Sequence, residues 1–170
     1  MIIFWRLLLS HLLADFTLQF DVVNRLKRKN LWGMLLHCLT HFVVSAALTW
    51  TYLPETWVHI GPLPVSGWWA LGIMLAVHFV IDELRVYSMK TLHYKDNTTS
   101  FLVDQALHFY VLFMISPVVV PAPGLVTGEK WAAIAVMLVT VTHFTTVLVY
   151  FFEKDMFGKA FPHFDEKYFL

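Results

Sequence analysis

The sequence predicts an all-α membrane protein: a single domain built as a bundle of five transmembrane helices. Composition is the first reason. Of the 170 residues, 58% are apolar and 14% are charged, and the mean hydropathy is +0.64, whereas soluble domains are about half apolar and about a quarter charged. The second reason is that the apolar residues gather in five runs near the roughly 20 residues that a helix needs to cross a bilayer. The net charge is zero, so nothing indicates a nucleic-acid partner.

Polar or proline-rich segments separate the five runs. The first run ends before the basic stretch NRLKRKN, and Pro54 stops the second. The next segment, PETWVHIGPLPVSG, is rich in proline and glycine, so we expect it to be irregular. Prolines at positions 117, 121 and 123 end the fourth run. Within one domain over 1–170, the predicted helices are about 2–20, 31–53, 67–89, 101–120 and 130–152, and an interfacial tail covers 155–170.

Lysine and arginine are distributed unevenly around these helices. Ten of the twelve follow the first, third or fifth helix, and only Arg6 and Lys130 lie toward the opposite ends. Short cytoplasmic segments of membrane proteins are enriched in these residues. We therefore expect a multi-pass protein with its N-terminus outside and its C-terminus in the cytoplasm.

Four of the predicted helices carry a pair of polar residues at i, i+4 spacing. This spacing puts both side chains on one helix face, about one turn apart, where two ligands can grip a single metal ion, as in the H-E-x-x-H zinc helix. The pairs are His11 with Asp15, His37 with His41, His78 with Asp82, and Asp104 with His108.

The four pairs are predicted to lie at one depth. At about 1.5 Å per residue, all eight side chains fall roughly 6–18 Å from the cytoplasmic ends of their helices. His143 on the fifth helix falls at a similar depth. We therefore expect the first four helices to face one another around one layer of ligands, with the fifth helix covering a side or contributing His143.

Two interpretations of this layer compete. A single histidine in an apolar helix is more often hydrogen-bonded to a neighbour than bound to metal, and Asp82 with Arg85 could simply mark a helix end as an i, i+3 pair. Ionisable groups inside membrane helices, however, are costly and usually functional. Three carboxylates in hydrocarbon need positive charge. Because most lysines and arginines are predicted at the interface, one or two divalent ions are the simpler source.

The residue types indicate which metal to expect. Five histidines and three aspartates without a thiolate set suit zinc, iron, manganese or cobalt, and we expect one of the first three. The three aspartates, Asp15, Asp82 and Asp104, would be ligands, or one of them a general base. The candidate ligands are His11, Asp15, His37, His41, His78, Asp82, Asp104 and His108.

Taken together, the patterns HLLxDFxLQ, HxxxH, HFxxD and DQxxH resemble an uncharacterised bacterial integral-membrane family, a domain of unknown function. The resemblance spans roughly residues 7–112 and implies a location in the bacterial inner membrane, but it brings no established activity. A looser similarity exists to small membrane proteins described as metal-dependent hydrolases, which also place His and Asp on apolar helices. Besides the eight candidate ligands, the matching residues are Gln19 and Gln105.

These observations predict a membrane-embedded, metal-dependent hydrolase that acts near the cytoplasmic leaflet. Its partners would be the lipid bilayer and a lipid or lipid-linked substrate. The first alternative is a metal-ion or proton-coupled transporter that uses the same cluster. The second is an accessory membrane subunit that binds haem through two histidines, although the sequence contains no haem attachment motif.

Overall fold

The computed structural model describes residues 2–18, 26–117 and 130–158. Within these residues the chain is predominantly helical, as the sequence predicted. Gln19, the part of the fourth predicted helix beyond 117 and most of the predicted tail lie outside the described residues. The helical elements are α1 (Ile2–Leu12), the π-helical turn η1 (Leu13–Thr17), α3 (Leu31–Thr49), the 3₁₀ turn η2 (Trp50–Tyr52), α4 (Gly67–Lys90), α5 (Thr98–Ile115), α7 (Lys130–Val139), the π-helical turn η3 (Thr140–Phe144) and α8 (Thr145–Phe157).

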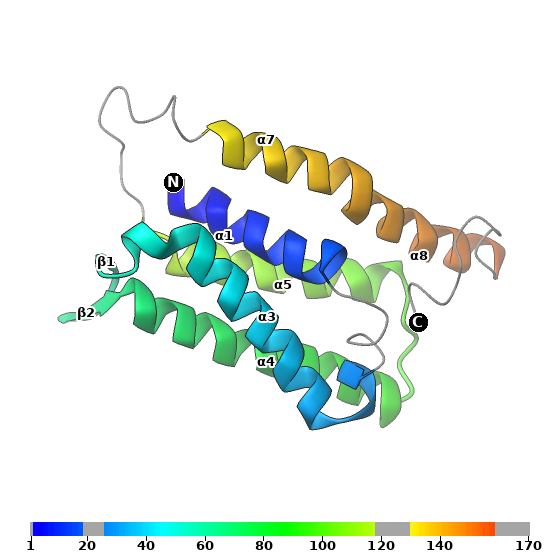
Figure 1. Ribbon diagram of the computed structural model, residues 1–170. Helices are drawn as coiled ribbons and strands as arrows, with labels where there is room; N and C mark the ends of the chain where they lie inside the picture. The colour runs from blue at the N-terminus through cyan, green and yellow to red at the C-terminus, as the bar shows by residue number, and fades with distance from the viewer. Residues whose placement is uncertain (1, 19–25, 118–129, 159–170) are drawn as a thin grey trace.

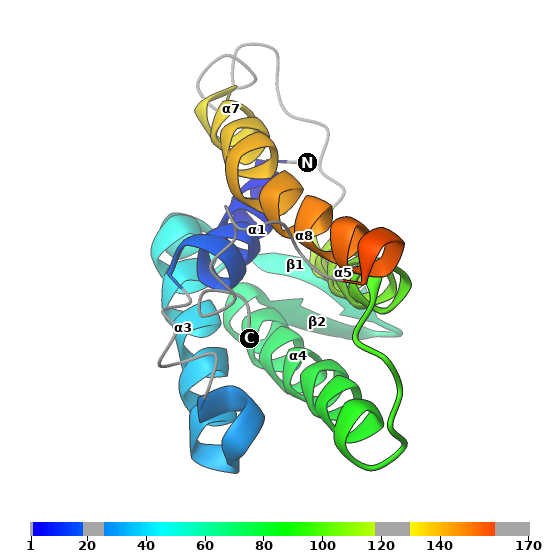
Figure 2. The ribbon, with the colours of Figure 1, turned by 90° about the vertical axis from the view of Figure 1, so that its right-hand side faces the viewer.

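α1, α3, α4, α5 and the continuous rod of α7 and α8 run in alternating directions along the bundle (Figure 1). The C-terminal ends of α4 and α8 therefore lie at the same end as the starts of α3 and α5; we call this the pocket end. α1 packs against α3, α5 and α7, and further contacts join α3 to α4, α4 to α5 and α5 to α8. Viewed from the pocket end, α3 and α4 lie below α1, α7 lies above it, and α8 lies to its side, next to α5 (Figure 2).

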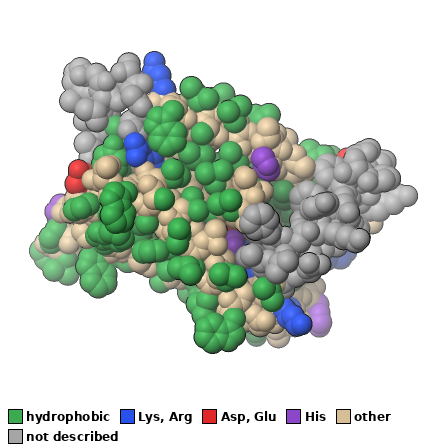
Figure 3. Space-filling view, viewed as in Figure 1, with side chains coloured by type: hydrophobic (Ala, Val, Ile, Leu, Met, Phe, Trp, Pro, Cys, Tyr) green, Lys and Arg blue, Asp and Glu red, His purple; other side chains and the backbone are tan. Residues whose placement is uncertain are grey.

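Three of these helices are long and apolar enough to cross a membrane, by length and composition: 31–52, 98–115 and 130–157. α1 is only 11 residues long, and α4 has four charged residues among its last nine. Apolar side chains cover most of the described part of one face, and the few charged ones lie toward its ends (Figure 3). Membrane association is therefore indicated, while insertion of all five helices stays a prediction.

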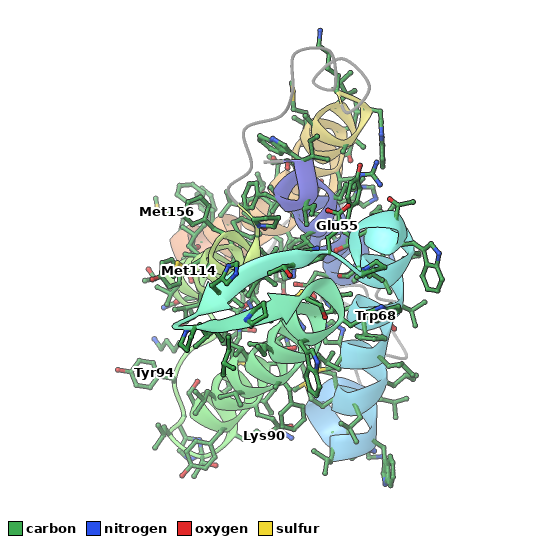
Figure 4. The ribbon with its side chains drawn as sticks, turned by 90° about the vertical axis from the view of Figure 1, so that its left-hand side faces the viewer. Glu55, Trp68, Lys90, Tyr94, Met114 and Met156 are labelled. Atoms are coloured by element: carbon green, nitrogen blue, oxygen red, sulfur yellow. The ribbon has the colours of Figure 1, made fainter. Side chains whose placement is uncertain are left out.

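The segment predicted to be irregular instead forms a β-hairpin at the end opposite the pocket end, which we call the hairpin end (Figure 4). Strands β1 (Thr56–Ile60) and β2 (Leu63–Ser66) pair antiparallel, with Ile60 opposite Leu63. The two-residue turn works because Gly61 adopts a φ of +60°, which glycine tolerates and tight hairpins require. Proline was read as a sign of irregularity, but here it occupies the turn and a short edge strand, where it is tolerated.

An apolar core closes the bundle at the hairpin end. Trp57 and Val65 of the hairpin pack in one buried cluster with Leu7 of α1, Leu71 of α4 and Leu112 of α5. The contact is close: a Cβ on Gly67, the first residue of α4, would lie 2.6 Å from the Trp57 ring. Four separate elements thus seal this end of the molecule with hydrocarbon.

The first predicted helix, 2–20, is not a regular α-helix to its end. After Leu12 it changes to the π-helical turn η1, in which the Leu18 amide donates to the Leu13 carbonyl over 2.7 Å. Single π-helical turns often occur at functional sites, and this one contains Asp15. The extra residue in the turn alters the direction in which Asp15 leaves the helix relative to His11.

Candidate metal centre

The structure brings the eight predicted site residues together in the interior of the bundle. The i, i+4 pairs of α3, α4 and α5 face inward, and so does the pair on α1 and η1. Seven of the eight residues are buried, and Asp15 exposes only 9% of its side chain. This His/Asp cluster consists of His11, Asp15, His37, His41, His78, Asp82, Asp104 and His108.

Four members of the cluster form a first ligand group, in which one ligand atom from each residue lies within 4.8 Å of the others: Asp15, His37, His41 and His78. The Asp15 Oδ1 atom lies 3.3 Å from His37 Nε2 and 3.1 Å from His41 Nε2. The Nε2 atoms of His37 and His78 are also 3.3 Å apart. Three helices, α1 with η1, α3 and α4, therefore direct their ligand atoms at one point.

These separations match tetrahedral coordination. Zinc binds imidazole nitrogen and carboxylate oxygen at about 2.0–2.1 Å, and the corners of a tetrahedron of that radius lie about 3.3 Å apart. Asp15 Oδ1 faces the Nε2 atoms of both His37 and His41, and His78 Nε2 faces His37 Nε2. The donor set fits a divalent ion of the zinc or iron class.

A second ligand group shares His78 and adds Asp82 and His108. The separations in this group are longer: Asp82 Oδ2 lies 3.4 Å from His78 Nε2, and Asp82 Oδ1 lies 3.8 Å from His108 Nε2. The Nδ1 of His108 donates to the Asp104 backbone carbonyl over 2.8 Å. This bond fixes the neutral tautomer, so that the lone pair of Nε2 points into the cluster, where Nε2 has no hydrogen-bond partner among the described residues.

His11 and Asp104 belong to neither ligand group, although the sequence placed them among the candidate ligands. His11 Nε2 lies 3.3 Å from Asp15 Oδ2 and 3.4 Å from the Gln105 side-chain oxygen. Gln105 in turn donates to Asp104 over 3.1 Å. Gln105 thus bridges His11 and Asp104. The contacts of His11 and Asp104 suit residues that position the ligands.

Lys27 is the functional residue that the sequence analysis missed. It was counted as an interfacial charge, but its Nζ lies 2.9 Å from Asp82 Oδ2 and donates to His37 Nε2 over 3.2 Å. Burial by itself lowers the pKa of the Lys27 ammonium, but the carboxylates of Asp82 and Asp15 outweigh that effect and raise the pKa above its usual value. Lys27 therefore contributes a positive charge inside the cluster.

A signal for this placement exists in the sequence, at Gly33. A Cβ at this position would lie 2.1 Å from the backbone carbon of Leu26, so only glycine lets the chain at 26–27 cross so closely over α3. Asn30 begins α3 by accepting a hydrogen bond from the Gly33 amide, as N-cap residues do. Together they hold the turn that directs Lys27 into the bundle.

Arg85 also differs from its predicted position as a helix-end partner of Asp82. Its Nη1 donates to Asp104 and its Nη2 to Asp96, each over 2.8 Å. Asp96 also pairs with Arg28 over 3.4 Å. The expectation that metal ions supply most of the positive charge is therefore partly wrong: Asp82 and Asp104 each form an ion pair with a lysine or arginine. Asp15 forms no such ion pair among the described residues.

His143 does not join the cluster. It lies in η3, is exposed, and shares a 2.7 Å hydrogen bond with Thr142. Of the two functions expected for the fifth helix, the structure shows the first, covering a side of the bundle. α7 packs against α1 and α8 packs against α5, while His143 does not face the ligands.

A cavity of about 130 Å³ adjoins the His/Asp cluster at the pocket end. Its polar wall contains Asp15, Lys27, Asp82 and Arg85, and its apolar wall includes Phe16, Met89, Phe101, Val147 and Phe151. On the other side of the cluster, toward the hairpin end, the remaining space is about 10 Å³, which is about the volume that one water needs. Within the described residues the cluster opens toward one end of the bundle.

A family model described as "Protein of unknown function (DUF3307)" matches residues 3–127, most of the chain. The chain belongs to the DUF3307 family. This agrees with the resemblance to an uncharacterised family, and the matched range includes all eight residues of the His/Asp cluster as well as Lys27 and Gly33. No curated protein and no solved structure matches the chain. The chemistry of this DUF3307 protein therefore has to be argued from the site.

Proposed function

We propose that this DUF3307 protein is a membrane-embedded, metal-dependent hydrolase that works from the pocket end of its bundle. The observation that carries the proposal is the first ligand group, whose neighbouring ligand atoms lie 3.1–3.3 Å apart beside a cavity. Hydrolysis needs a coordination position for water besides the four protein ligands, and zinc can expand to five-coordinate to take one. The cavity supplies room for water and a substrate next to the ligands.

The residues around the cavity suit hydrolysis. A divalent ion held here would lower the pKa of a water that it binds and polarise a carbonyl or phosphoryl oxygen. The Asp82 carboxylate lines the cavity and lies beside the ligand His78, where it can accept a proton from water. Asp104 is engaged by Arg85 and Gln105, so we assign it a positioning function.

The cavity walls indicate the class of substrate. One wall carries aspartate, lysine and arginine side chains, and the other is built from phenylalanine, valine and methionine side chains. A molecule that fits both walls has a polar reacting group joined to an apolar part. A lipid or lipid-linked substrate meets this description, and it is available where the helices 31–52, 98–115 and 130–157 would lie in a membrane.

The same three helices support a membrane location. We place the protein in the inner membrane, with the pocket end and residues 24–30, 91–100 and 155–170 in the cytoplasm, because the basic residues collect there. The substrate would then reach the cavity from the cytoplasm or from the inner leaflet.

The two alternatives receive less support. Transport needs a polar path to both faces, but the side toward the hairpin end holds a gap of about 10 Å³ followed by the apolar core of Leu7, Leu71 and Leu112. Haem held by two histidines needs its flat macrocycle between two imidazoles. The rings of His37, His41 and His78 contact one another, with centroids 4.0–5.3 Å apart, which leaves no such space.

Two assays on the purified full chain separate hydrolysis from transport. In sealed proteoliposomes containing a zinc indicator, we expect no zinc flux; saturable flux that disappears in Asp82→Asn would favour the transporter. In detergent, we expect zinc-dependent hydrolysis within a panel of 4-nitrophenyl phosphate and 4-nitrophenyl esters with long acyl chains. His41→Ala should abolish it, and the exposed control His143→Ala should leave it unchanged.

A further inference from the structure

We propose that the His/Asp cluster holds one divalent ion, in the first ligand group, and that the Lys27 ammonium takes the place of a second ion beside Asp82. This inference rests on the proposed metal site. Eight candidate ligands allow either one or two ions, and the proposal favours one. It assigns the positive charge beside Asp82 to the Lys27 side chain.

The first argument is charge. Arg85 lies 2.8 Å from Asp104, and Lys27 lies 2.9 Å from Asp82. The ion-pair contacts of Asp15 are with histidines: His11, His37 and His41. Asp15 is therefore the cluster carboxylate that lacks a lysine or arginine partner among the described residues. A buried carboxylate needs such a partner or a metal, which places the ion at Asp15.

The second argument is geometry. The first ligand group offers four ligand atoms, and three of the pairs among them lie 3.1–3.3 Å apart, close to the separation in tetrahedral coordination. The second ligand group offers three, of which His78 is shared, and its separations to Asp82 are 3.4 and 3.8 Å. An ion bound at Asp82 would also meet the Lys27 ammonium at close range. Two like charges in a poorly solvated interior repel strongly.

The third argument is that the position of Lys27 is built into the fold. Gly33 permits the close crossing of the chain at 26–27 over α3, and Arg28, the next residue, pairs with Asp96. When the ion binds, His37 gives up its hydrogen bond from Lys27 and turns its lone pair to the metal, while the shorter contact from Lys27 to Asp82 remains. Because Lys27 also lines the cavity, its ammonium faces the substrate beside the ion.

The overall charge supports one ion as well. With neutral histidines, the three carboxylates, Lys27, Arg85 and one divalent ion leave the centre with a single positive charge. One monoanionic substrate group neutralises that charge. Two divalent ions would leave three positive charges in an apolar bundle, which is costly.

The test is the zinc content of the purified full chain, stripped with a chelator, reloaded with zinc and measured by plasma mass spectrometry. We expect one zinc per chain in the wild type and in the neighbouring control Lys29→Met, since Lys29 is exposed. Lys27→Met should bind two, because Asp82 then lacks its cation, and the charge-preserving Lys27→Arg should bind one. Asp15→Asn should lose the zinc, whereas Asp82→Asn should keep it.

The outcomes are distinguishable. Two zinc ions in the wild type would overturn the lysine proposal while supporting the metal site, and so would loss of zinc in Asp82→Asn with retention in Asp15→Asn. No zinc in the wild type would overturn the proposed function itself. If Lys27→Met does not fold, as judged by gel filtration, the comparison of the wild type with Asp15→Asn and Asp82→Asn decides the matter.

Discussion

The Nε2 atoms of His37 and His78 lie 3.3 Å apart, although the two residues are separated by 41 positions and belong to different helices. Two imidazole nitrogens at this distance share one proton, or both lone pairs face a common cation. Asp15 Oδ1 lies 3.3 Å from the same His37 atom, and three such atoms around one point favour the cation.

Loss of one ligand should reduce metal affinity selectively. His41 lies 3.1 Å from Asp15 Oδ1 within the first ligand group. We expect His41→Ala to weaken zinc binding by more than the roughly 10–100-fold that follows loss of a residue that only orients a ligand. Isothermal titration with zinc measures this, and His143→Ala is the matched control. Equal zinc affinity in the two variants would contradict the ligand assignment.

The close crossing at Gly33 predicts an unequal pair of glycine substitutions. Gly33→Ala would place a Cβ 2.1 Å from the Leu26 backbone, whereas a Cβ at Gly72 of α4 has nothing within 4 Å. We expect Gly33→Ala to lower the free energy of unfolding by about 1–3 kcal/mol, the typical cost of overpacking. Gly72→Ala should raise it by about 0.5–1 kcal/mol through helix propensity.

Denaturant unfolding in detergent compares the two glycine variants. Equal stability for both would show that the chain at 26–27 does not lie against α3. In that case the proposed position of Lys27 would fail too.

The contact of Arg85 with Asp104 predicts a coupling energy. The pair is 2.8 Å apart, with 20% and 6% of the side chains exposed. We expect Arg85→Met to destabilise the protein by about 1–3 kcal/mol, because it leaves a buried carboxylate without its partner. In a double-mutant cycle with Asp104→Leu, the coupling should exceed about 0.5 kcal/mol, and additive effects would contradict the contact.

The predicted topology can be tested by cysteine accessibility. In a Cys38→Ala background, new cysteines at the exposed positions 29 and 95 should be shielded from a membrane-impermeant probe in intact cells. A cysteine at the exposed position 59 of the hairpin should be labelled. Labelling at 29 or 95 from outside would reverse the orientation.

The sequence predicted the helical class and the meeting of the His/Asp pairs because both depend on local periodicity. In an up-and-down bundle, a polar i, i+4 pair on an apolar helix is costly to expose to lipid and therefore faces the neighbouring helices. The pairs of α3, α4 and α5 illustrate this. The position of His143 could not be predicted, because depth alone does not tell which face of a helix turns inward.

Other features depended on chain geometry that local patterns do not contain. Lys27 enters the cluster because the backbone at Leu26 crosses closely over Gly33 of α3. The glycine is visible in the sequence, but the contact that it permits is a tertiary one. The hairpin arises because Gly61 accepts a positive φ. The π-helical turn at Asp15 likewise has no composition signal.

X-ray absorption on the zinc-loaded full chain tests the central claim most directly, since it reports the ligands of the ion itself. The account predicts a four-coordinate shell of nitrogen and oxygen at about 2.0–2.1 Å, with outer-shell scattering from three imidazoles that falls to two in His41→Ala. A shell that contains sulfur, or one of oxygen alone without imidazole scattering, would contradict it.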